Sequence, residues 1–432
     1  MRGYSIVDRH DFGMFGNYAF AAGDIDGDGK AEFAMLSKQG DALLVLDHDG
    51  AKAWDATLEN RNTWGTAPLL IADVDGDGKG EILAPDDHGA RRGVRVFDGR
   101  GRELATLSCP QGEPDYDGAV IDAIAAALRA DGKVIVVVLL NGGLLYAFED
   151  LAAEATWCLR TSTRYFEHYL HIGDINGDGS DEIVFSGKPG QGHDVNPPEQ
   201  SFMHVVGLDG RERWRKPLSE IAPGKPVDHL DFIEVAPVLP DLAPARQIVV
   251  SMGGCVLDPD GKMLWSLNEA VGHCDWVDVG CTGDGALVLF STHYPELSVL
   301  LADAGGKELW RWEPGDLAGE NCVAGHARFI DWDGDGRLEI VFGEQSAPWD
   351  PAVEWSGHEP LSTVTQTVNL YVVSLEGKLI ERVSYEDQTL GGWWYNGENR
   401  PLVLDVDGDG GEEWVWQSRL GAALVIKKTG EA

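Results

Sequence analysis

A nine-residue pattern that recurs five times along the chain constrains the fold more than any other feature of the sequence. The pattern is Asp-x-Asp-Gly-Asp-Gly, with Asn in the third place of one copy, and every copy carries an acid in its ninth place. The copies span residues 24–32, 73–81, 174–182, 331–339 and 405–413. A run of residues typical of β-strands follows each copy. The pattern is therefore predicted to form a loop that connects two strands.

The spacing of the oxygen-bearing side chains favours a calcium ion in each loop. Oxygens in the first, third, fifth and ninth places, with a Gly in the sixth place that permits a sharp turn, let one loop surround a hard cation. We expect about five structural Ca2+ ions, and Asp-Gly turns without metal are the alternative. The predicted ligands are Asp24, Asp26, Asp28, Glu32, Asp73, Asp75, Asp77, Glu81, Asp174, Asn176, Asp178, Glu182, Asp331, Asp333, Asp335, Glu339, Asp405, Asp407, Asp409 and Glu413.

Degenerate copies of the same unit lie between the intact loops. They are recognisable around Asp122, Glu234 and Asp278, where the strand-like runs survive but the ligands do not. The units then begin at residues 24, 73, 122, 174, 234, 278, 331 and 405, about 50 residues apart. Hairpin signals in phase with the loops, such as the segment from Leu257 to Trp265, bring each unit to four strands. Repeated four-stranded units of ~40 to 50 residues are typical of propeller blades.

The sequence therefore predicts an all-β fold, a β-propeller of eight four-stranded blades in a single domain that spans residues 1–432. A seven-bladed ring is the alternative. The last unit ends one strand short after residues 423–427, and residues 4–8 precede the first unit. We expect this N-terminal strand to join the last blade, which closes the ring and removes open sheet edges.

Equivalent positions before the first acid of each unit are predicted to line one mouth of the axial channel. Five positions before that acid lie Tyr169, His229, His273, His326 and Arg400, and three positions before it lie His171, Asp231, Asp275 and Arg328. Trp393, Trp394 and Tyr395 precede the last inner strand and add aromatic surface, or alternatively pack between blades. Polar groups concentrated at one level favour a functional site, and a zinc ion held by the three imidazoles is an alternative.

Composition excludes several kinds of partner. The formal net charge of −38 disfavours nucleic acid and anionic membrane surfaces, although bound cations would neutralise part of it. No run approaches the ~18 apolar residues of a membrane span. The six cysteines show no zinc spacing, so we expect free thiols, with a Cys274–Cys281 bridge as the alternative. The N-terminus lacks an apolar signal core, which predicts a cytoplasmic protein, or a secreted or periplasmic one if a leader has been removed.

The Asp-x-Asp-Gly-Asp-Gly loops resemble the FG-GAP-type repeats of calcium-binding propellers, including those of integrin α chains. Together with Gly272-His273-Cys274-Asp275 they look similar to the propeller-fold polysaccharide lyases, notably the rhamnogalacturonan lyases, and to rhamnose–glucuronate and ulvan lyases. The resemblance covers nearly the whole chain as architecture and only short stretches as functional motifs. It implies a carbohydrate-active lyase whose substrate is an acidic, rhamnose-rich glycan that contains uronic acid.

Elimination from a uronate requires a group that neutralises the carboxylate, a base for the C5 proton and an acid for the leaving oxygen. The predicted roles are His273 or His326 as base, Tyr169 or His229 as acid, and Arg400 with Arg328 on the carboxylate. His171, Asp275, Trp393, Trp394 and Tyr395 are predicted to bind substrate. The alternatives are a non-catalytic propeller that binds a glycan or protein, and a glycoside hydrolase that uses Asp117, Asp231 or Asp275.

Overall fold

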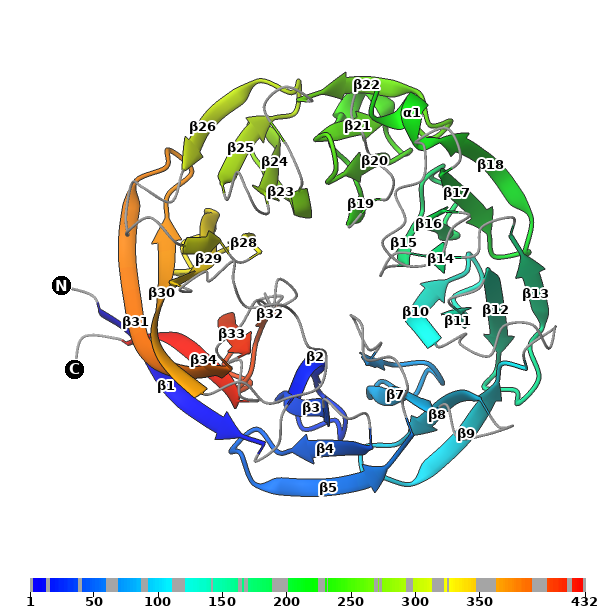
Figure 1. The fold of residues 1–432 in the computed structure, drawn as a ribbon, viewed down its shortest axis with the longest axis horizontal. Coiled ribbons are helices and arrows are strands. Elements are labelled where there is room, and N and C mark those ends of the chain that lie inside the picture. The colour runs from blue at the N-terminus through cyan, green and yellow to red at the C-terminus, as the bar shows by residue number, and fades with distance from the viewer. Residues whose placement is uncertain are drawn as a thin grey trace.

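The strands form eight antiparallel sheets arranged as the blades of a ring (Figure 1). The computed structural model describes residues 3–12, 16–37, 41–59, 69–86, 92–110, 121–140, 143–161, 165–166, 170–188, 201–223, 230, 232–267, 271, 274–292, 298–312, 322–324, 326–346, 363–390, 402–417 and 422–429. The predicted eight-bladed propeller is confirmed, and the seven-bladed alternative is wrong.

Blades 1 to 4 follow one another along the first half of the chain. Blade 1 contains β2 (Gly16–Gly23), β3 (Glu32–Ser37), β4 (Ala42–Leu46) and β5 (Lys52–Thr57). Blade 2 contains β6 (Leu70–Ala72), β7 (Glu81–Asp86), β8 (Gly93–Phe97) and β9 (Glu103–Ser108). Blade 3 contains β10 (Ile121–Leu128), β11 (Val134–Leu140), β12 (Leu144–Glu149) and β13 (Trp157–Arg160). Blade 4 contains β14 (Tyr165–Phe166), β15 (His171–Gly173), β16 (Glu182–Lys188), β17 (Phe202–Gly207) and β18 (Glu212–Pro217).

Blades 5 to 8 complete the ring. Blade 5 contains β19 (Ile233–Ala236), β20 (Gln247–Val250), β21 (Cys255–Leu257) and β22 (Met263–Ser266). Blade 6 contains β23 (Cys274–Thr282), β24 (Gly285–Thr292), β25 (Val299–Asp303) and β26 (Glu308–Trp312). Blade 7 contains β27 (Cys322–Ala324), β28 (Arg328–Ile330), β29 (Glu339–Ser346), β30 (Thr363–Val373) and β31 (Leu379–Leu390). Blade 8 contains β32 (Leu402–Leu404), β33 (Glu413–Gln417), β34 (Ala422–Thr429) and β1 (Gly3–Asp11).

The two ends of the chain close the ring in blade 8. Strand β1 pairs antiparallel with β34 from the Gly3–Thr429 pair to the Asp11–Ala422 pair, with a bulge after Ile6. The outer strand of the last blade therefore comes from the N-terminus, as predicted. In the described part of the chain, helix is limited to α1 (Leu218–Ile221) and the 3-10 turn η2 (Pro240–Leu242), and no helix is long and apolar enough to cross a membrane.

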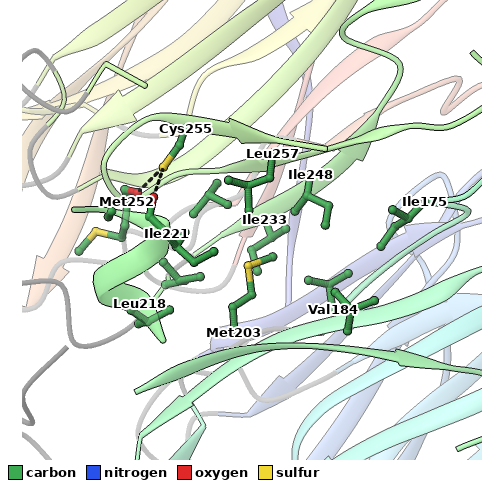
Figure 2. Packing of buried hydrophobic residues seen from close by; sticks show 14 residues of the cluster. Ile175, Val184, Met203, Leu218, Ile221, Ile233, Ile248, Met252, Cys255 and Leu257 are labelled. Atoms are coloured by element: carbon green, nitrogen blue, oxygen red, sulfur yellow. Dashed lines mark hydrogen bonds between the residues drawn. The ribbon is translucent and has the colours of Figure 1, made fainter. Parts of the chain in front are cut away.

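The hydrophobic core is divided among the interfaces between neighbouring blades, because alternate residues of each strand face opposite sides of its sheet. Eight clusters of buried residues lie between successive blades. In the cluster between blades 4 and 5, Val184 and Met203 face Ile248 and Leu257 (Figure 2). Each blade thus depends on both neighbours to bury its two faces.

Tryptophans near the outer edge add a polar contact to five of these interfaces. The indole nitrogen of each Trp donates to a backbone carbonyl in the β-turn of the next blade, at 2.7–3.1 Å. The pairs are Trp54–Gly99, Trp157–Leu208, Trp214–Pro259, Trp265–Ala304 and Trp310–Leu375. The Trp-bearing hairpins seen in the sequence therefore join neighbouring blades as well as forming strands.

Candidate functional site

The five acidic loops share one backbone geometry, and each connects the inner strand of a blade to the second strand. In the first loop, Asp24 accepts hydrogen bonds from the N–H groups of Gly27 (2.6 Å) and Gly29 (2.9 Å). Both glycines have positive φ, 85° and 84°, a conformation that other residues rarely adopt. The carboxylate of the first acid therefore folds the loop around itself, and the sixth-position Gly permits the turn.

The acid in the ninth place lies beneath each loop. One oxygen of this Glu accepts the N–H of the second loop residue at 2.8–3.0 Å in all five copies. In the first loop Glu32 is only 2% exposed, and its other oxygen, Oε1, is buried and accepts no hydrogen bond from the described residues. Burial, helped by the neighbouring loop carboxylates, raises the pKa of Glu32, Glu81 and Glu182 to about 7.

These loops fit a hard divalent cation. One oxygen from each of the first, third and ninth residues lies within 4.8 Å of the others in four loops. Oxygens that each lie 2.3–2.6 Å from one Ca2+ ion are at most ~5 Å apart, so the clusters have a suitable size. Oε1 of Glu32 supplies a ligand atom that no donor in the described part of the chain uses. The four clusters are Asp24, Asp26 and Glu32; Asp73, Asp75 and Glu81; Asp331, Asp333 and Glu339; and Asp405, Asp407 and Glu413.

The remaining loop, residues 174–182, differs at its third position. The amide nitrogen of Asn176 donates to Oε1 of Glu182 at 2.7 Å, while its oxygen accepts the N–H of Asp178 at 2.8 Å. Asp174 accepts from Gly177 and Gly179, as the first acid does from the equivalent glycines in the loops of blades 1, 2 and 8. This loop therefore keeps the same fold with one carboxylate fewer.

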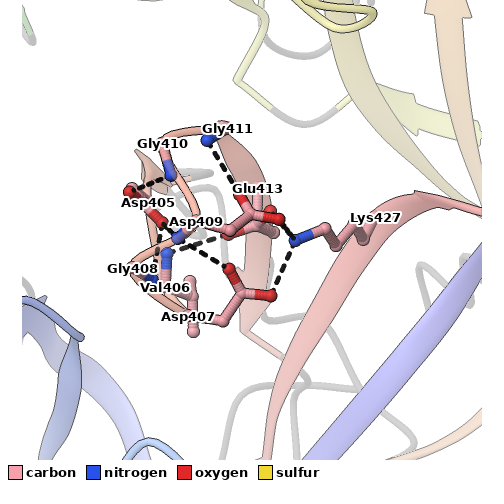
Figure 3. A network of polar contacts seen from close by, with 9 residues as sticks. All are labelled: Asp405, Val406, Asp407, Gly408, Asp409, Gly410, Gly411, Glu413 and Lys427. Atoms are coloured by element: carbon pink, nitrogen blue, oxygen red, sulfur yellow. Dashed lines mark hydrogen bonds and ion pairs between the residues drawn. The ribbon is translucent and has the colours of Figure 1, made fainter.

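The loop of blade 8 differs more strongly, because a lysine reaches into it (Figure 3). Nζ of Lys427, on β34, lies 2.6 Å from Asp407, 2.6 Å from Asp409 and 3.0 Å from Glu413. Partial burial opposes the charge, but hydrogen bonds to the three carboxylates hold the pKa of Lys427 above its usual value. An ammonium group thus occupies the position where a metal ion would contact these ligands.

The loops also tie neighbouring blades together. The N–H of Gly80 donates to the carbonyl of Asp24 at 2.9 Å, and the N–H of Ala31 donates to that of Val406 at 3.0 Å. The first contact joins blades 2 and 1, and the second joins blade 1 to blade 8. A cation that stiffens one loop therefore also stiffens the adjoining blade interface.

A second site lies on the innermost strands of blades 4 to 7, and the strand pairing corrects the register predicted there. Gly173 pairs with the ninth-position Glu182, and in blade 5 the corresponding pair is Ala236 with Gln247. The fifth unit therefore begins at residue 237, three residues later than predicted. In blade 6 the Gly280–Leu287 pair places the start at residue 281, again three residues later.

With this register, the position five residues before the unit start carries a row of stacked rings in blades 5, 6 and 7. Phe232 and Trp276 occupy it in blades 5 and 6, in place of the predicted His229 and His273. His326, 2% exposed, stacks on Trp276 with ring centroids 4.7 Å apart and an angle of 12°. Trp276 stacks in turn on Phe232 at 3.9 Å. The stack of rings therefore crosses two blade boundaries near the axis.

In blades 4, 5 and 6 the position three residues before the unit start carries a polar group that bonds to the next blade. Nε2 of His171 accepts the N–H of Ile233 at 3.1 Å. Oδ2 of Asp278 accepts both the N–H of Phe329 (2.7 Å) and Nε of Arg328 (3.1 Å). Inner strands have no neighbour on the axial side, so these side chains satisfy backbone groups that the sheet leaves unpaired.

Glu234 occupies the same position in blade 5. Like Asp278, it was predicted as a unit start and lies three residues before the start that strand pairing gives. Burial and the charge of Asp278 raise the pKa of Glu234 to about 8, although Arg328 and the N–H of Val279 act in the opposite direction. A carboxyl group with this pKa keeps its proton at neutral pH and donates hydrogen bonds. Sequence analysis identified Glu234 only as the start of a degenerate unit. The register of β19 against β20, which places Glu234 within the inner strand, could not be read from the sequence.

Arg328 provides the cation of this group. Its guanidinium carbon lies 5.6 Å from the centre of the Trp276 ring, which is a cation–π distance, and its side chain is 31% exposed. Among the described residues only Nε donates a hydrogen bond, to Asp278. We refer to Glu234, Trp276, Asp278, His326 and Arg328 as the axial cluster.

Several predicted site residues lie outside the described residues, so their positions stay predictions. They are Asp117, Tyr169, His229, Asp231, His273, Trp393, Trp394, Tyr395 and Arg400, and for Asp275 only the backbone, in β23, is described. The three-histidine zinc site depends on two of them. Cys274 and Cys281 form no disulfide, so the bridge considered between them is absent.

Comparison with known proteins supports the repeat assignment. Residues 14–84 match the model of the FG-GAP-like repeat. This segment contains the first two acidic loops. The resemblance predicted from the loops is confirmed.

One relative with a sequence match is named as an enzyme. The chain is 27% identical over 187 residues to the rhamnogalacturonan endolyase YesW of Bacillus subtilis (strain 168), a match that covers 38% of the chain and 26% of the relative. The chain therefore matches about a quarter of that protein's length. The sequence similarity to a rhamnogalacturonan lyase is confirmed over this part.

Solved structures with little sequence similarity share the fold. Sqt1 of Saccharomyces cerevisiae superposes with a TM-score of 0.61 at 9% identity, covering 100% of both chains. BamB of Moraxella catarrhalis superposes with a TM-score of 0.53 at 12% identity, covering 96% of this chain and 98% of that one. At such low identity these similarities show the fold alone.

Proposed function

We propose that this propeller is a lyase that cleaves a uronic-acid-containing, rhamnose-rich glycan by β-elimination at the axial end of blades 4–7. The observation that carries the proposal is the axial cluster, in which a cation, a protonated acid and a histidine stacked on a tryptophan lie together. Similarity to a rhamnogalacturonan endolyase over 38% of the chain supports the same class of reaction. An acidic carbohydrate is accordingly the proposed substrate.

Elimination from a uronate needs three groups. A base removes the proton at C5, the electron pair of that C–H bond forms the C4–C5 double bond, and the C4–O bond breaks. An acid gives a proton to the leaving oxygen. The C5 proton becomes acidic enough only if the adjacent carboxylate is neutralised, since charge develops there in the transition state.

The axial cluster supplies a candidate for each role. Arg328 is partly exposed and offers its terminal nitrogens to the carboxylate, while Asp278 holds its Nε and fixes its orientation. His326 is the proposed base. Glu234 keeps a proton at neutral pH and is the proposed acid. Tyr169, His229, His273 and Arg400 remain candidates on the sequence argument, and Trp276, which is buried between Phe232 and His326, holds the ring of His326 in place.

We also propose that the cation of the intact loops is Ca2+ and that its role is structural. The ligands are carboxylates and an amide, which suit hard cations. The loops end the inner strands, at the face opposite to the one where those strands begin near the axial cluster. Bound calcium would stabilise blade interfaces at a distance from the reacting groups.

The test is formation of the double bond. Calcium-loaded protein is incubated with rhamnogalacturonan, ulvan and gum arabic, and the ultraviolet absorbance of an unsaturated uronate is followed. We expect R328M and H326A to lower the rate by about 100-fold or more. R311M is the matched control, because Arg311 pairs with Glu308 on the outer strand β26. Absence of the signal on every uronate from folded protein would contradict the proposal.

A non-catalytic binding role is the second candidate, and one observation favours it. His171, Glu234 and Asp278 each accept a backbone N–H from the next blade, which a purely structural role also explains. In that case the protein would retain glycan on an affinity column without forming any double bond. Release of saturated products would instead indicate a hydrolase, so product analysis separates the three.

A further inference from the structure

The acidic loop of blade 8 contains its own cation. The ammonium of Lys427 contacts the third, fifth and ninth residues of the loop, Asp407, Asp409 and Glu413, at 2.6–3.0 Å (Figure 3). These are three of the four side chains that would ligate a metal ion. Glu413 is only 1% exposed, so the ammonium reaches the innermost ligand as well as the outer ones.

Strand register explains why this occurs in one blade. Lys427 lies one residue beyond the Trp414–Ile426 pair and is therefore opposite Glu413. In blade 4 the residue opposite the ninth-position acid is Gly207. In blades 1, 2 and 7 the residue at this position is identified from the adjoining strand pairs. Its occupants there are Asp47, Asp98 and Ser374. Among these five loops, blade 8 alone places a cationic residue at this position.

The chemistry of the position decides what each loop can bind. An acidic, small or hydroxyl-bearing residue beside the carboxylates leaves room for a divalent ion. A lysine there places a positive charge within hydrogen-bond distance of the ligands, and a divalent ion would be repelled by it at close range. Lys427 also forms ion pairs with three carboxylates at once. Displacing the ammonium group would leave its positive charge without these partners.

We propose that the loop at residues 405–413 takes no calcium ion and that Lys427 is its permanent internal cation. The predicted number of calcium ions then falls from five to four. The blade that closes the ring with both chain ends would hold its loop without metal, so ring closure would not depend on calcium. This inference concerns the loop alone and does not rest on the lyase activity.

The test is a reciprocal exchange between blades 8 and 7. Calcium bound per chain is measured by titration calorimetry and by elemental analysis after removal of free ion, for the natural protein, K427S and S374K. K427S gives blade 8 the residue of blade 7, and we expect one more bound ion than in the natural protein. S374K places an amine opposite Glu339, and we expect one fewer.

Equal calcium content in the natural protein and K427S would overturn the proposal. If K427S is too unstable for its bound calcium to be counted, its melting temperature provides the test. With a chelator present, K427S should melt below the natural protein, because three carboxylates lose their cation, and added calcium should restore it. S374K provides an independent result, since an unchanged calcium content in a folded S374K protein would also contradict the proposal.

Discussion

The indole nitrogen of Trp265 donates a hydrogen bond to the carbonyl oxygen of Ala304 across the boundary between blades 5 and 6, at 2.8 Å. The ring also lies against Gly306, whose φ is 81°. A Cβ at Gly306 would lie 2.7 Å from a ring carbon of Trp265. The contact therefore requires both a donor on one blade and a glycine on the next.

Removing either half of this contact should destabilise the ring. W265F loses the hydrogen bond and should lower the free energy of unfolding by about 1 kcal/mol. G306A forces a left-handed conformation on alanine and displaces the indole, and should cost about 1–3 kcal/mol. Urea denaturation measures both. G283A is the control, since a Cβ there meets no atom within 4 Å, and an equal loss in G283A would contradict the explanation.

Removal of calcium should lower thermal stability substantially. A ligand at ~100 times its dissociation constant stabilises by about 2.7 kcal/mol per site, and each loop joins two strands and adjoins the next blade. We expect a chelator to lower the melting temperature and added calcium to restore it. E81Q should remove most of the contribution of the second loop, whereas D284N, in an exposed turn, should change nothing. A melting temperature that the chelator leaves unchanged would count against metal in the loops.

The effect of calcium should grow with pH. Without metal, the raised pKa values of Glu32, Glu81 and Glu182 mean that the folded state favours the protonated forms. Their contribution to stability is full below the usual glutamate pKa and is lost as the pH rises through about 7. Calcium binds the ionised forms, so its affinity rises over the same range.

Melting temperatures with and without calcium, measured from about pH 5 to about pH 8, check this prediction. The metal-free protein should lose stability as the pH rises, and the difference between the two series should widen. In E32Q the widening should be smaller, because one titrating group is gone. A difference that stays constant or shrinks towards high pH would show that these carboxyl groups do not control calcium binding.

The ring and its loops were predictable because their signals are local. Loop spacing and hairpin turns depend on residues close together in the sequence, and they predicted eight blades. The last unit lacks one strand, and this local count predicted closure by β1 from the other end of the chain. The register of blades 5 and 6 was not predictable in the same way. Without the ligand pattern, Glu234 and Asp278 were treated as unit starts, although they lie three residues earlier, within the inner strands.

The axial cluster and the internal lysine depend on contacts between distant segments. Stacking of His326 on Trp276 joins two blades, and only strand pairing places Lys427 opposite Glu413. The sequence did place His326, Arg328 and His171 on the innermost strands or next to them. It did not show that His171 bonds to a backbone N–H of the next blade.

The ion pair between Arg328 and Asp278 should be coupled to the charge of Glu234. R328M leaves the carboxylate of Asp278 without its cation and should lower stability by about 1–3 kcal/mol at neutral pH, where Glu234 is protonated. Adding D278N to R328M removes this unpaired charge and should recover part of the loss. A double-mutant cycle from urea denaturation measures this coupling.

The pH dependence of that cycle separates a charge effect from lost packing. Burial raises the pKa of Glu234 to about 8, so its contribution to stability is full at low pH and is lost as the pH rises through about 8. E234Q should therefore be much more stable than the natural protein at about pH 9 and gain little at about pH 4, below the usual glutamate pKa. The exposed pair of Arg9 and Asp11 is the control, with expected coupling near zero. Equal effects of E234Q at both pH values would show that the carboxyl group does not titrate in this range.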